Sequence, residues 1–304
     1  MATRKTTRKA EPAAAPRQRT ARAIKLATFN VNGIRSRLPH VLQWLEREAP
    51  DVACLQELKS ADHGFPKAEF ERAGYGALWK GQSSWNGVAI LARGSEPVEI
   101  RRELPGDPGD DHSRYLEAAV AGIVVACIYL PNGNPQPGPK FDYKLRWFDR
   151  LIAHANALFA SGHPVALLGD FNVVPTDRDI YNPASWRKDA LLQPESRERY
   201  AALLDQGWTD ALRAMHPDEP VYTFWDYFRE HWRRDAGLRI DHVLLNASLA
   251  PRLKAAGVDR WVRALEKPSD HAPVWVQLRA PRAVKSPATG SDAPKAVRRA
   301  HRVR

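Results

Sequence analysis

Hydrophobic residues are spaced along the first part of the chain in a way that predicts alternating strands and helices. Two short, mostly apolar runs, 24–31 (IKLATFNV) and 52–56 (VACLQ), are typical of strands. Between them, apolar residues recur every three or four positions, which predicts an amphipathic helix over 37–49. A strand, a helix and a second strand in this order indicate an α/β fold.

The same alternation continues over the middle and the end of the chain. Amphipathic segments predict a long helix over 141–160 and shorter helices over 196–206 and 209–215. Further strands are predicted, in chain order, over 75–79, 87–92, 116–120, 123–130, 164–172, 239–245, 258–262 and 272–278. Many strands and few helices, with no internal repeat and no linker, favour two packed sheets with helices outside them, in one domain over 24–280.

The two ends of the chain differ from this core in composition. Residues 1–23 and 281–304 each contain seven Lys or Arg and one acidic residue, a net charge of +6 each, so 24–280 carries −1 of the total +11. Both ends lack aromatic residues and are rich in Ala, Pro and Arg, so we expect disordered tails. Such tails either attract the phosphate backbone of a nucleic acid or are merely solvated. A transit peptide at the N-terminus is a third alternative.

The rest of the composition excludes several classes of protein. No apolar run approaches the roughly 20 residues that a membrane helix needs. The two cysteines, Cys54 and Cys127, lie inside apolar runs without the His or Cys neighbours that a zinc site needs, so we expect both in the core. Two thiols and no disulfide framework fit a protein of the reducing cytoplasm.

Polar residues gather where the predicted strands begin or end. In chain order they are Asn30, Glu57, Asp170, Asn172, Asp241, Asp270 and His271. Each one alone is more often a turn or capping residue. Together they form an oxygen-rich set with one His and no Cys, which suits Mg²⁺ or Mn²⁺ rather than structural zinc. A hard metal ion beside a base and neutral hydrogen-bond donors is what the hydrolysis of a phosphodiester needs.

Five segments carry a more specific pattern: NVNGIR (30–35), LQE (55–57), GDFNVVPTD (169–177), GLRIDH (237–242) and EKPSDHAPVW (266–275). In order and spacing they resemble the exonuclease III family, the class II abasic-site endonucleases of the endonuclease/exonuclease/phosphatase superfamily. GDFN and SDH occur across that superfamily, whereas NVNGIR, YTFWDY, GLRID and EKPSDHAPVW are typical of its DNA-repair branch. The resemblance implies a DNase I-like fold, a four-layer α/β sandwich with two central mixed sheets flanked by helices.

The resemblance also implies roles for individual residues. The implied metal ligands, for Mg²⁺ or its substitute Mn²⁺, are Glu57 as the main ligand with Asn30, Asn32 and Asp270 nearby. The implied catalytic residues are Asp170, His271, Asp241, Asn172 and Tyr129. Asp170 positions or activates the attacking water, while His271 contacts the phosphate and is oriented by Asp241. Asn172 donates to a phosphate oxygen, and the phenol of Tyr129 lies at the scissile phosphate. At neutral pH we expect Asp170 to be ionised and able to accept a proton.

A pocket for a flipped sugar is implied as well. Its substrate-binding residues are Asn132, which supports Tyr129, and Phe224, Trp225, Leu238 and Ile240. A small apolar pocket admits a deoxyribose without a base and excludes a normal nucleotide, and flipping costs least where base pairing is already lost. The alternative is that the apolar members are ordinary core and that Trp225 only packs beside them.

The activity that the resemblance implies is hydrolysis of the DNA backbone 5′ to abasic sites, with 3′→5′ exonuclease and 3′-end-cleaning activity. The implied partner is double-stranded DNA with abasic sites or damaged 3′ ends. The implied protein is a monomer of the bacterial-type cytoplasm, associated with the nucleoid while acting and without a membrane contact.

Three alternatives remain open at this point. The chain is mainly a 3′→5′ exodeoxyribonuclease, or it is a phosphodiesterase for lipid or inositol phosphates, or it is a binding module without catalysis, which the complete acidic set disfavours. Leu58 and the segments 133–140 and 177–193 depart from the family's pattern. Both segments are expected to flank the DNA groove, so the balance between internal incision and 3′-end trimming is open.

Overall fold

The computed structural model describes residues 22–281 of the protein. Arg22–Ala280 form one compact unit. The predicted basic tails, 1–23 and 281–304, lie outside the described residues except for their innermost positions, so the hypotheses about them remain predictions.

The first of two six-stranded sheets contains the strands from both ends of this unit. Its strands, in spatial order, are β11 (Leu253–Val258), β12 (Val274–Leu278), β1 (Ile24–Asn30), β2 (Val52–Gln56), β4 (Val88–Arg93) and β3 (Tyr75–Lys80). Only β1 and β2 run parallel, and all other neighbours are antiparallel. A parallel pair needs a crossover connection, which is the helix α1 (Ile34–Glu48).

The second sheet repeats this plan. Its strands, in spatial order, are β5 (Val98–Arg101), β6 (Tyr115–Val120), β7 (Ile123–Tyr129), β8 (Val165–Asp170), β10 (Asp241–Leu245) and β9 (Thr209–Asp210). Here β7 and β8 are the parallel pair, and the long helix α3 (Pro139–Ala160) joins them. Each sheet therefore has one strand–helix–strand unit in its middle, with strands that end at the same edge.

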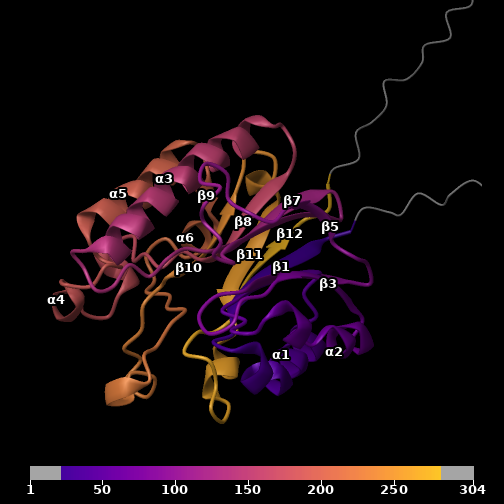
Figure 1. Ribbon diagram of the computed structural model, residues 1–304, viewed down its shortest axis with the longest axis horizontal. Coiled ribbons are helices and arrows are strands. Elements are labelled where there is room, and N and C mark those ends of the chain that lie inside the picture. The colour runs from indigo at the N-terminus through magenta and orange to yellow at the C-terminus, as the bar shows by residue number, and fades with distance from the viewer. Residues whose placement is uncertain (1–21, 282–304) are drawn as a thin grey trace, which may run out of the picture. The chain divides into compact units, whose positions relative to one another are not determined.

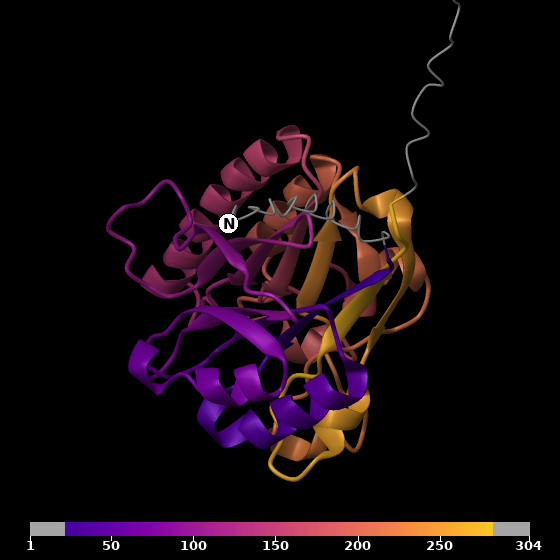
Figure 2. The same ribbon diagram turned by 90° about the vertical axis from the view of Figure 1, so that its right-hand side faces the viewer.

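Helices cover the two outer faces of the paired sheets, α1 and α2 (Lys67–Arg72) on one side and α3 and α5 (Pro194–Asp205) on the other (Figures 1 and 2). The shorter helices and turns are α4 (Pro183–Trp186), α6 (Ala211–Met215), η1 (Asp62–Gly64), η2 (Asp177–Asp179), η3 (Phe228–Glu230), η4 (Ala250–Arg252) and η5 (Arg260–Ala264). Helix, sheet, sheet and helix make the four-layer sandwich that the resemblance implies, and the prediction of the fold is confirmed.

The alternation of side chains along the strands explains the layers. In β1, Leu26 packs into the core between the sheets, whereas Ala27 and Phe29 pack under α1 and α2. In β8, Leu168 faces the same inter-sheet core, and Leu167 packs under α3 and α5. Because both faces of the central strands are buried, they are apolar throughout rather than alternating.

The predicted strands differ from the structure at three sheet edges. Residues 258–262 were predicted as a strand, but the strand is β11 and most of the predicted range belongs to the turn η5. The edge strand β5 was not predicted, and 209–215 divides into β9 and α6. The side chains of β5 are all exposed and those of β11 are mostly half-buried, so the apolar pattern that reveals a strand is missing there.

Candidate active site

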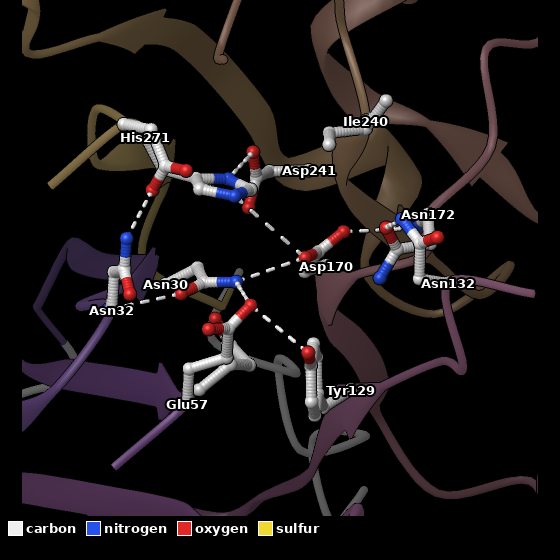
Figure 3. Close-up of polar contacts among 12 residues, drawn as sticks. Asn30, Asn32, Glu57, Tyr129, Asn132, Asp170, Asn172, Ile240, Asp241 and His271 are labelled. Carbon is white, nitrogen blue, oxygen red and sulfur yellow. Dashed lines mark hydrogen bonds and ion pairs between the residues drawn. The ribbon is translucent and has the colours of Figure 1, made fainter. Parts of the chain in front are cut away.

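The polar residues of the sequence motifs meet where the central strands of both sheets end (Figure 3). Asn30 ends β1 and Glu57 directly follows β2, while Tyr129 and Asp170 end β7 and β8. In the second sheet, Asp241 at the start of the antiparallel β10 lies opposite Asp170. Residues far apart in the chain, such as Asn30 and Asp241, therefore lie close together.

One asparagine joins the two sheets at this point. The Nδ2 atom of Asn30 donates a hydrogen bond to Glu57 Oε1 and another to Asp170 Oδ2, each at 2.9 Å. Glu57 Oε1 also accepts a hydrogen bond of 2.9 Å from the phenol of Tyr129. The side chain of Asn30 is fully buried, so both of its bonds act in an environment of low polarity, where they are strong.

The backbone is strained at several of these positions. Asn32, Glu57 and Asn172 have φ angles of +47°, +52° and +46°. A residue other than glycine in this left-handed region costs roughly 1–2 kcal/mol, and less for Asn. Non-glycine residues in this conformation concentrate at functional sites, where the surrounding structure holds them.

Close packing of two strands explains the glycine before Asp170. A Cβ atom on Gly169 would lie 1.8 Å from the carbonyl oxygen of Ile128 on the neighbouring strand β7. Only glycine fits there, and the close approach brings the end of β8, with Asp170, beside Tyr129. The glycine of the GDFN motif is therefore a packing requirement.

The four predicted metal ligands lie together and offer oxygen atoms. Asn32 Nδ2 donates to Asp270 Oδ1 at 2.9 Å, and the backbone N–H of Asn32 donates to Asn30 Oδ1 at 3.1 Å. With Glu57, the set contains two carboxylates and two amides, which is the donor chemistry that Mg²⁺ and Mn²⁺ prefer. The residues present therefore fit such an ion.

A lysine outside the predicted set contacts two of its members. Lys59 Nζ lies 2.9 Å from Glu57 Oε2 and 2.6 Å from Asn32 Oδ1. Burial raises the pKa of Glu57, but Lys59 and the bond from Asn30 outweigh it, so the pKa lies below its usual value. Glu57 is thus ionised at neutral pH.

A buried histidine–aspartate pair lies on the other side of Asn30. His271 Nδ1 and Asp241 Oδ2 are 2.8 Å apart, and Asp241 Oδ2 also accepts a 2.7 Å bond from the Thr223 hydroxyl. Burial lowers the pKa of His271, but Asp241 and Asp170 outweigh this and raise it to about 10. The imidazole is therefore protonated at neutral pH and carries a proton on both nitrogens.

Asp170 lies between this pair and Asn30. Its Oδ2 atom is 3.8 Å from His271 Nε2, and its Oδ1 accepts a 2.9 Å bond from the backbone N–H of Asn172. Burial and the nearby Asp241 carboxylate, only partly offset by His271, raise the pKa of Asp170 to about 7. The expectation that Asp170 is ionised at neutral pH and accepts a proton stays a prediction.

Asp170, Asp241 and His271 also form a cluster in which one ligand atom from each lies within 4.8 Å of the others. A histidine binds a metal ion through a neutral nitrogen. Because His271 is a cation here, the cluster is better described as an ion-pair network, and the oxygen set around Glu57 is the stronger candidate metal site.

Two asparagines, Asn132 and Asn172, lie beside Asp170. Asn132 Nδ2 donates to Asn172 Oδ1 at 3.1 Å, and Asn172 Nδ2 donates to the Leu130 carbonyl at 2.8 Å. The second N–H of Asn172 Nδ2 is available to a ligand in the cavity. Asn132 contacts Asn172 rather than Tyr129, which it was expected to support.

A cavity of about 210 Å³ lies at this site. The predicted polar residues that line it are Glu57, Tyr129, Asn132, Asp170, Asn172, Asp270 and His271. Phe224 and Ile240 contribute apolar walls, as predicted for a sugar pocket. Trp225 and Leu238 do not line the cavity: Trp225 is fully buried with its indole N–H bonded to Asp235, and Leu238 pairs with Phe224 through backbone bonds. Both side chains therefore lie behind the wall, and their part in substrate binding stays a prediction.

The sequence missed three further residues of the cavity wall: Trp186, Asp189 and Leu191. All three belong to the segment 177–193, which the sequence marked only as unlike the family's pattern. No motif surrounds them, and their place in the wall depends on how this long loop folds back over β8 and β10. A weak signal was available, because an aromatic residue in a polar loop needs a surface to cover.

Comparison with known proteins agrees with this geometry. Residues 27–271 match the model of the endonuclease/exonuclease/phosphatase family. The chain is 35% identical to exodeoxyribonuclease III of Haemophilus influenzae over 84% of this chain and 100% of the relative. A 3′-phosphatase from Neisseria, solved with a product DNA hairpin, superimposes with a TM-score of 0.81 at 40% identity, over 84% of this chain and 99% of the other. An AP endonuclease from Archaeoglobus fulgidus gives 0.79 at 37% identity, over 83% and 98%. The shared motifs, the two-sheet fold and these matches together make the chain a member of the endonuclease/exonuclease/phosphatase family.

Proposed function

We propose that this protein is a metal-dependent phosphodiesterase that hydrolyses the backbone of double-stranded DNA 5′ to abasic sites. The observation that carries the proposal is the pairing of Asn30 with Glu57 and Asp170, which puts an oxygen-rich metal site next to a base and a buried imidazolium. The names of the similar proteins, which include both an AP endonuclease and an exodeoxyribonuclease, support a DNA substrate.

The charges of the cavity support a division of labour. His271, protonated at neutral pH, binds a non-bridging oxygen of the scissile phosphate, and Asp241 keeps it oriented. Asn172 donates its free N–H to another oxygen. Asp170, with a pKa of about 7, is matched to accept a proton from the attacking water at neutral pH. Tyr129, whose phenol points to Glu57, faces the phosphate from the other side.

Glu57, Asp270, Asn30 and Asn32 are the residues that would hold the metal ion, Mg²⁺ or Mn²⁺ as its substitute. When bound, the ion neutralises charge on the phosphate. Lys59 has an ammonium among the same oxygens and supplies positive charge to this half of the cavity. Within the described residues, no helix is long and apolar enough to cross a membrane.

The walls of the cavity favour a sugar without a base. Phe224, Ile240 and Leu191 present apolar surface beside the polar atoms of Asp170 and Asn172. An abasic deoxyribose offers an apolar ring face and no base edge, so it fits a small cavity of this kind. A normal nucleotide carries a base as well, and a cavity of this size excludes it.

Exposed aromatic side chains near the metal site support contact with bases. Trp85 is 73% exposed, and its ring lies 5.8 Å from Lys59 Nζ. Phe228 is 74% exposed and follows Tyr227, whose hydroxyl accepts a bond from Asn32. Exposed aromatic rings stack on bases or wedge between them.

We propose residues 24–280 as the catalytic domain that carries this surface. We further propose that the protein acts as a monomer at the nucleoid.

A second candidate activity is 3′→5′ exonuclease and 3′-end cleaning. It is favoured by the similarity to the Neisseria 3′-phosphatase and by the departure in 177–193, a segment that contributes Trp186, Asp189 and Leu191 to the cavity wall. Both activities use the same catalytic residues and differ in which DNA end or gap reaches them.

The test is cleavage of a labelled duplex with one central abasic site, beside an intact duplex, in Mg²⁺ and in EDTA. We expect one Mg²⁺-dependent cut 5′ to the abasic site, and a loss of about 100-fold or more in rate for Asp170→Asn, because the base is removed while the shape is kept. A matched control is Asp205→Asn, at the end of α5 and away from the cavity.

A ladder of products from the 3′ end of both duplexes would favour the exonuclease as the main activity. No product from folded protein with either duplex would refute the proposal and redirect the search to other phosphodiesters.

A further inference from the structure

Helix α3 carries a lysine on its buried face. The stripe of α3 that packs against the second sheet includes Phe141, Trp147, Phe148 and Leu151, and Lys144 lies in the same stripe with no exposed surface. The heptad spacing between Lys144 and Leu151 predicts an apolar side chain at both. A lysine at this position therefore needs an explanation other than packing.

The ammonium of Lys144 is bonded to three loops of the active site. Its Nζ donates to the carbonyl oxygens of Asn172 at 2.6 Å, Asn132 at 3.0 Å and Ala190 at 3.4 Å. An ammonium has three N–H groups, so this arrangement uses all of them. Two of the acceptors belong to residues that line the cavity, and the third lies between the lining residues Asp189 and Leu191.

The loop before α3 is shaped around the stem of this lysine. Gly133 has a φ of +90°, and a Cβ atom on it would lie 2.6 Å from Lys144 Cδ. Any larger residue at 133 would displace the stem or the loop. This contact is independent of the hydrogen bonds and shows the same close fit between Lys144 and the loop that carries Asn132.

The two segments that depart from the family's pattern are joined above Lys144. Asn134 Nδ2 donates to Asp189 Oδ1 at 3.0 Å, and its Oδ1 accepts from the backbone N–H of Ala190 at 2.9 Å. Gln136 adds a bond of 2.8 Å to the carbonyl of Lys188. The loop 131–138 and the segment 187–191 are therefore joined into one wall. Lys144 bonds to both of them, through the carbonyls of Asn132 and Ala190.

Burying this ammonium is costly. Its nearest carboxylates, Asp189 and Asp170, act on it only through space, and burial lowers the pKa of Lys144 to about 7 in spite of them. A buried cation without an ion pair costs several kcal/mol, whereas a methionine of similar length would pack there at little cost. What an apolar residue lacks is the ability to hold three carbonyls in fixed directions.

We propose that Lys144 is a positioning residue of the active site, which holds the Asn132 loop, the Asn172 turn and the wall at 189–191 in one arrangement. Through their backbones it fixes the two amide side chains at the phosphate and the edge of the sugar pocket. Such preorganisation lowers the barrier because the donors need not reorient during the reaction. The inference rests on the proposed function for its effect on rate, but not for its effect on the three loops.

The first test compares Lys144→Met with Leu151→Met, a control one heptad away in the same buried stripe of α3. Hydrogen–deuterium exchange should rise at least about threefold in peptides covering 131–136, 171–175 and 187–192 of Lys144→Met, and only there. Leu151→Met should leave these peptides unchanged. If Lys144→Met does not fold, Lys144→Gln, which keeps two N–H donors on a shorter stem, takes its place.

The second test uses rates of cleavage of the abasic duplex. We expect kcat of Lys144→Met to fall about 10- to 100-fold, the loss typical of residues that orient the groups in direct contact with a metal or substrate. KM should change less than about twofold. The double variant Lys144→Met/Asn172→Ala should lose less than the two single losses combined, since Lys144 acts in part through Asn172.

The outcomes separate the two proposals. If the wild-type protein does not cut abasic DNA, the proposed function fails, and the exchange experiment alone decides the role of Lys144. Unchanged exchange in the three loops, or rate losses that add fully in the double variant, would overturn the positioning role of Lys144.

Discussion

Single residues in the cavity take their charge from burial and from one or two neighbours. Asp170 and Asp241 lie on opposite sides of the same imidazole: Asp241 is bonded directly to His271, and burial raises the pKa of Asp170 to about 7. Glu57 stays ionised beside Lys59. Two carboxylates with separated roles and one fixed imidazolium are what an acid–base mechanism on phosphate requires.

Tyr129 offers a test at this scale. Burial, and then the neighbouring Glu57, raise its pKa well above the usual range, so the phenol stays a hydrogen-bond donor at every working pH. Tyr129→Phe removes the 2.9 Å bond to Glu57 and leaves that ligand less firmly oriented. We expect a loss of about 10- to 100-fold in kcat and a weaker affinity for Mn²⁺, measured by single-turnover cleavage and by calorimetric titration.

The matched control is Tyr75→Phe. Its hydroxyl donates to the carbonyl of Pro50 at 2.9 Å under the first sheet, away from the cavity. This variant should lose about 1 kcal/mol of stability and keep its rate. Equal rates for Tyr129→Phe and the wild type would remove Tyr129 from the active site.

Elements on one flank of the cavity are joined by a buried ionic network around Arg239. Its guanidinium bonds to Asp179 in η2 and to Asp210 in β9, each at 2.6 Å. Arg213 of α6 adds a second bond to Asp179, also 2.6 Å. Burial and Arg239 lower the pKa of His242 to about 4, so this histidine is neutral at pH 7. The network fixes the start of β10, and with it Asp241.

The stability of this network depends on pH in a defined direction. Burial alone would raise the pKa of Asp179, but Arg239, Thr176 and Arg213 outweigh it and hold the pKa far below 3.8. A carboxyl with a depressed folded-state pKa contributes stability above its unfolded pKa and loses it as the pH falls toward the folded value. We therefore expect Asp179→Asn to lower the free energy of unfolding by about 3–5 kcal/mol at pH 7.

The difference between Asp179→Asn and the wild type should narrow below about pH 4. Urea denaturation at pH 7, 5 and 3.5 measures it, with the exposed Asp218→Asn as a control that changes little. A difference that stays constant down to pH 3.5 would show that the carboxylate charge of Asp179 is not what stabilises the network.

At the scale of the whole molecule, the site is a junction between the two sheets. Glu57, Asn30 and Asn32 follow strands of the first sheet, while Asp170 and Asp241 belong to the second. A ligand held by these residues binds only the folded sandwich, so it stabilises the fold by mass action. The proposed metal ion should therefore act as a link between the layers.

Removal of the metal tests this expectation without reference to activity. At a Mn²⁺ concentration about 100 times its Kd, the ion should add about 2.7 kcal/mol to the free energy of unfolding, and EDTA should abolish the gain. Glu57→Gln should show little of it, whereas Glu99→Gln on the exposed edge strand β5 should show all of it. Differential scanning calorimetry measures the shift, and an equal shift in Glu57→Gln would place the ion elsewhere.

Much of the fold and of the cavity could be predicted because local pattern and motif coincide there. The central strands are buried on both faces and read as apolar runs, and the polar residues that follow them, such as Glu57 and Asp170, stand out for that reason. Parallel strands joined by helices end at a common edge, so strand-end residues were expected to meet. Edge strands such as β5 were missed because they bury no face and leave no apolar pattern.

The sequence by itself determined the two-sheet architecture and the identity of the polar groups at the strand ends. Only the tertiary structure decided their environment: the pKa values of Asp170 and His271, the position of Lys59 among the ligands, and the burial of Lys144 under three loops. The tertiary structure also decided that Trp225 lies behind the cavity wall and that Trp186 and Asp189 belong to the wall. The physical reason is that strand and helix periodicity is local along the chain, whereas burial, charge pairing and loop contacts depend on residues far apart in sequence.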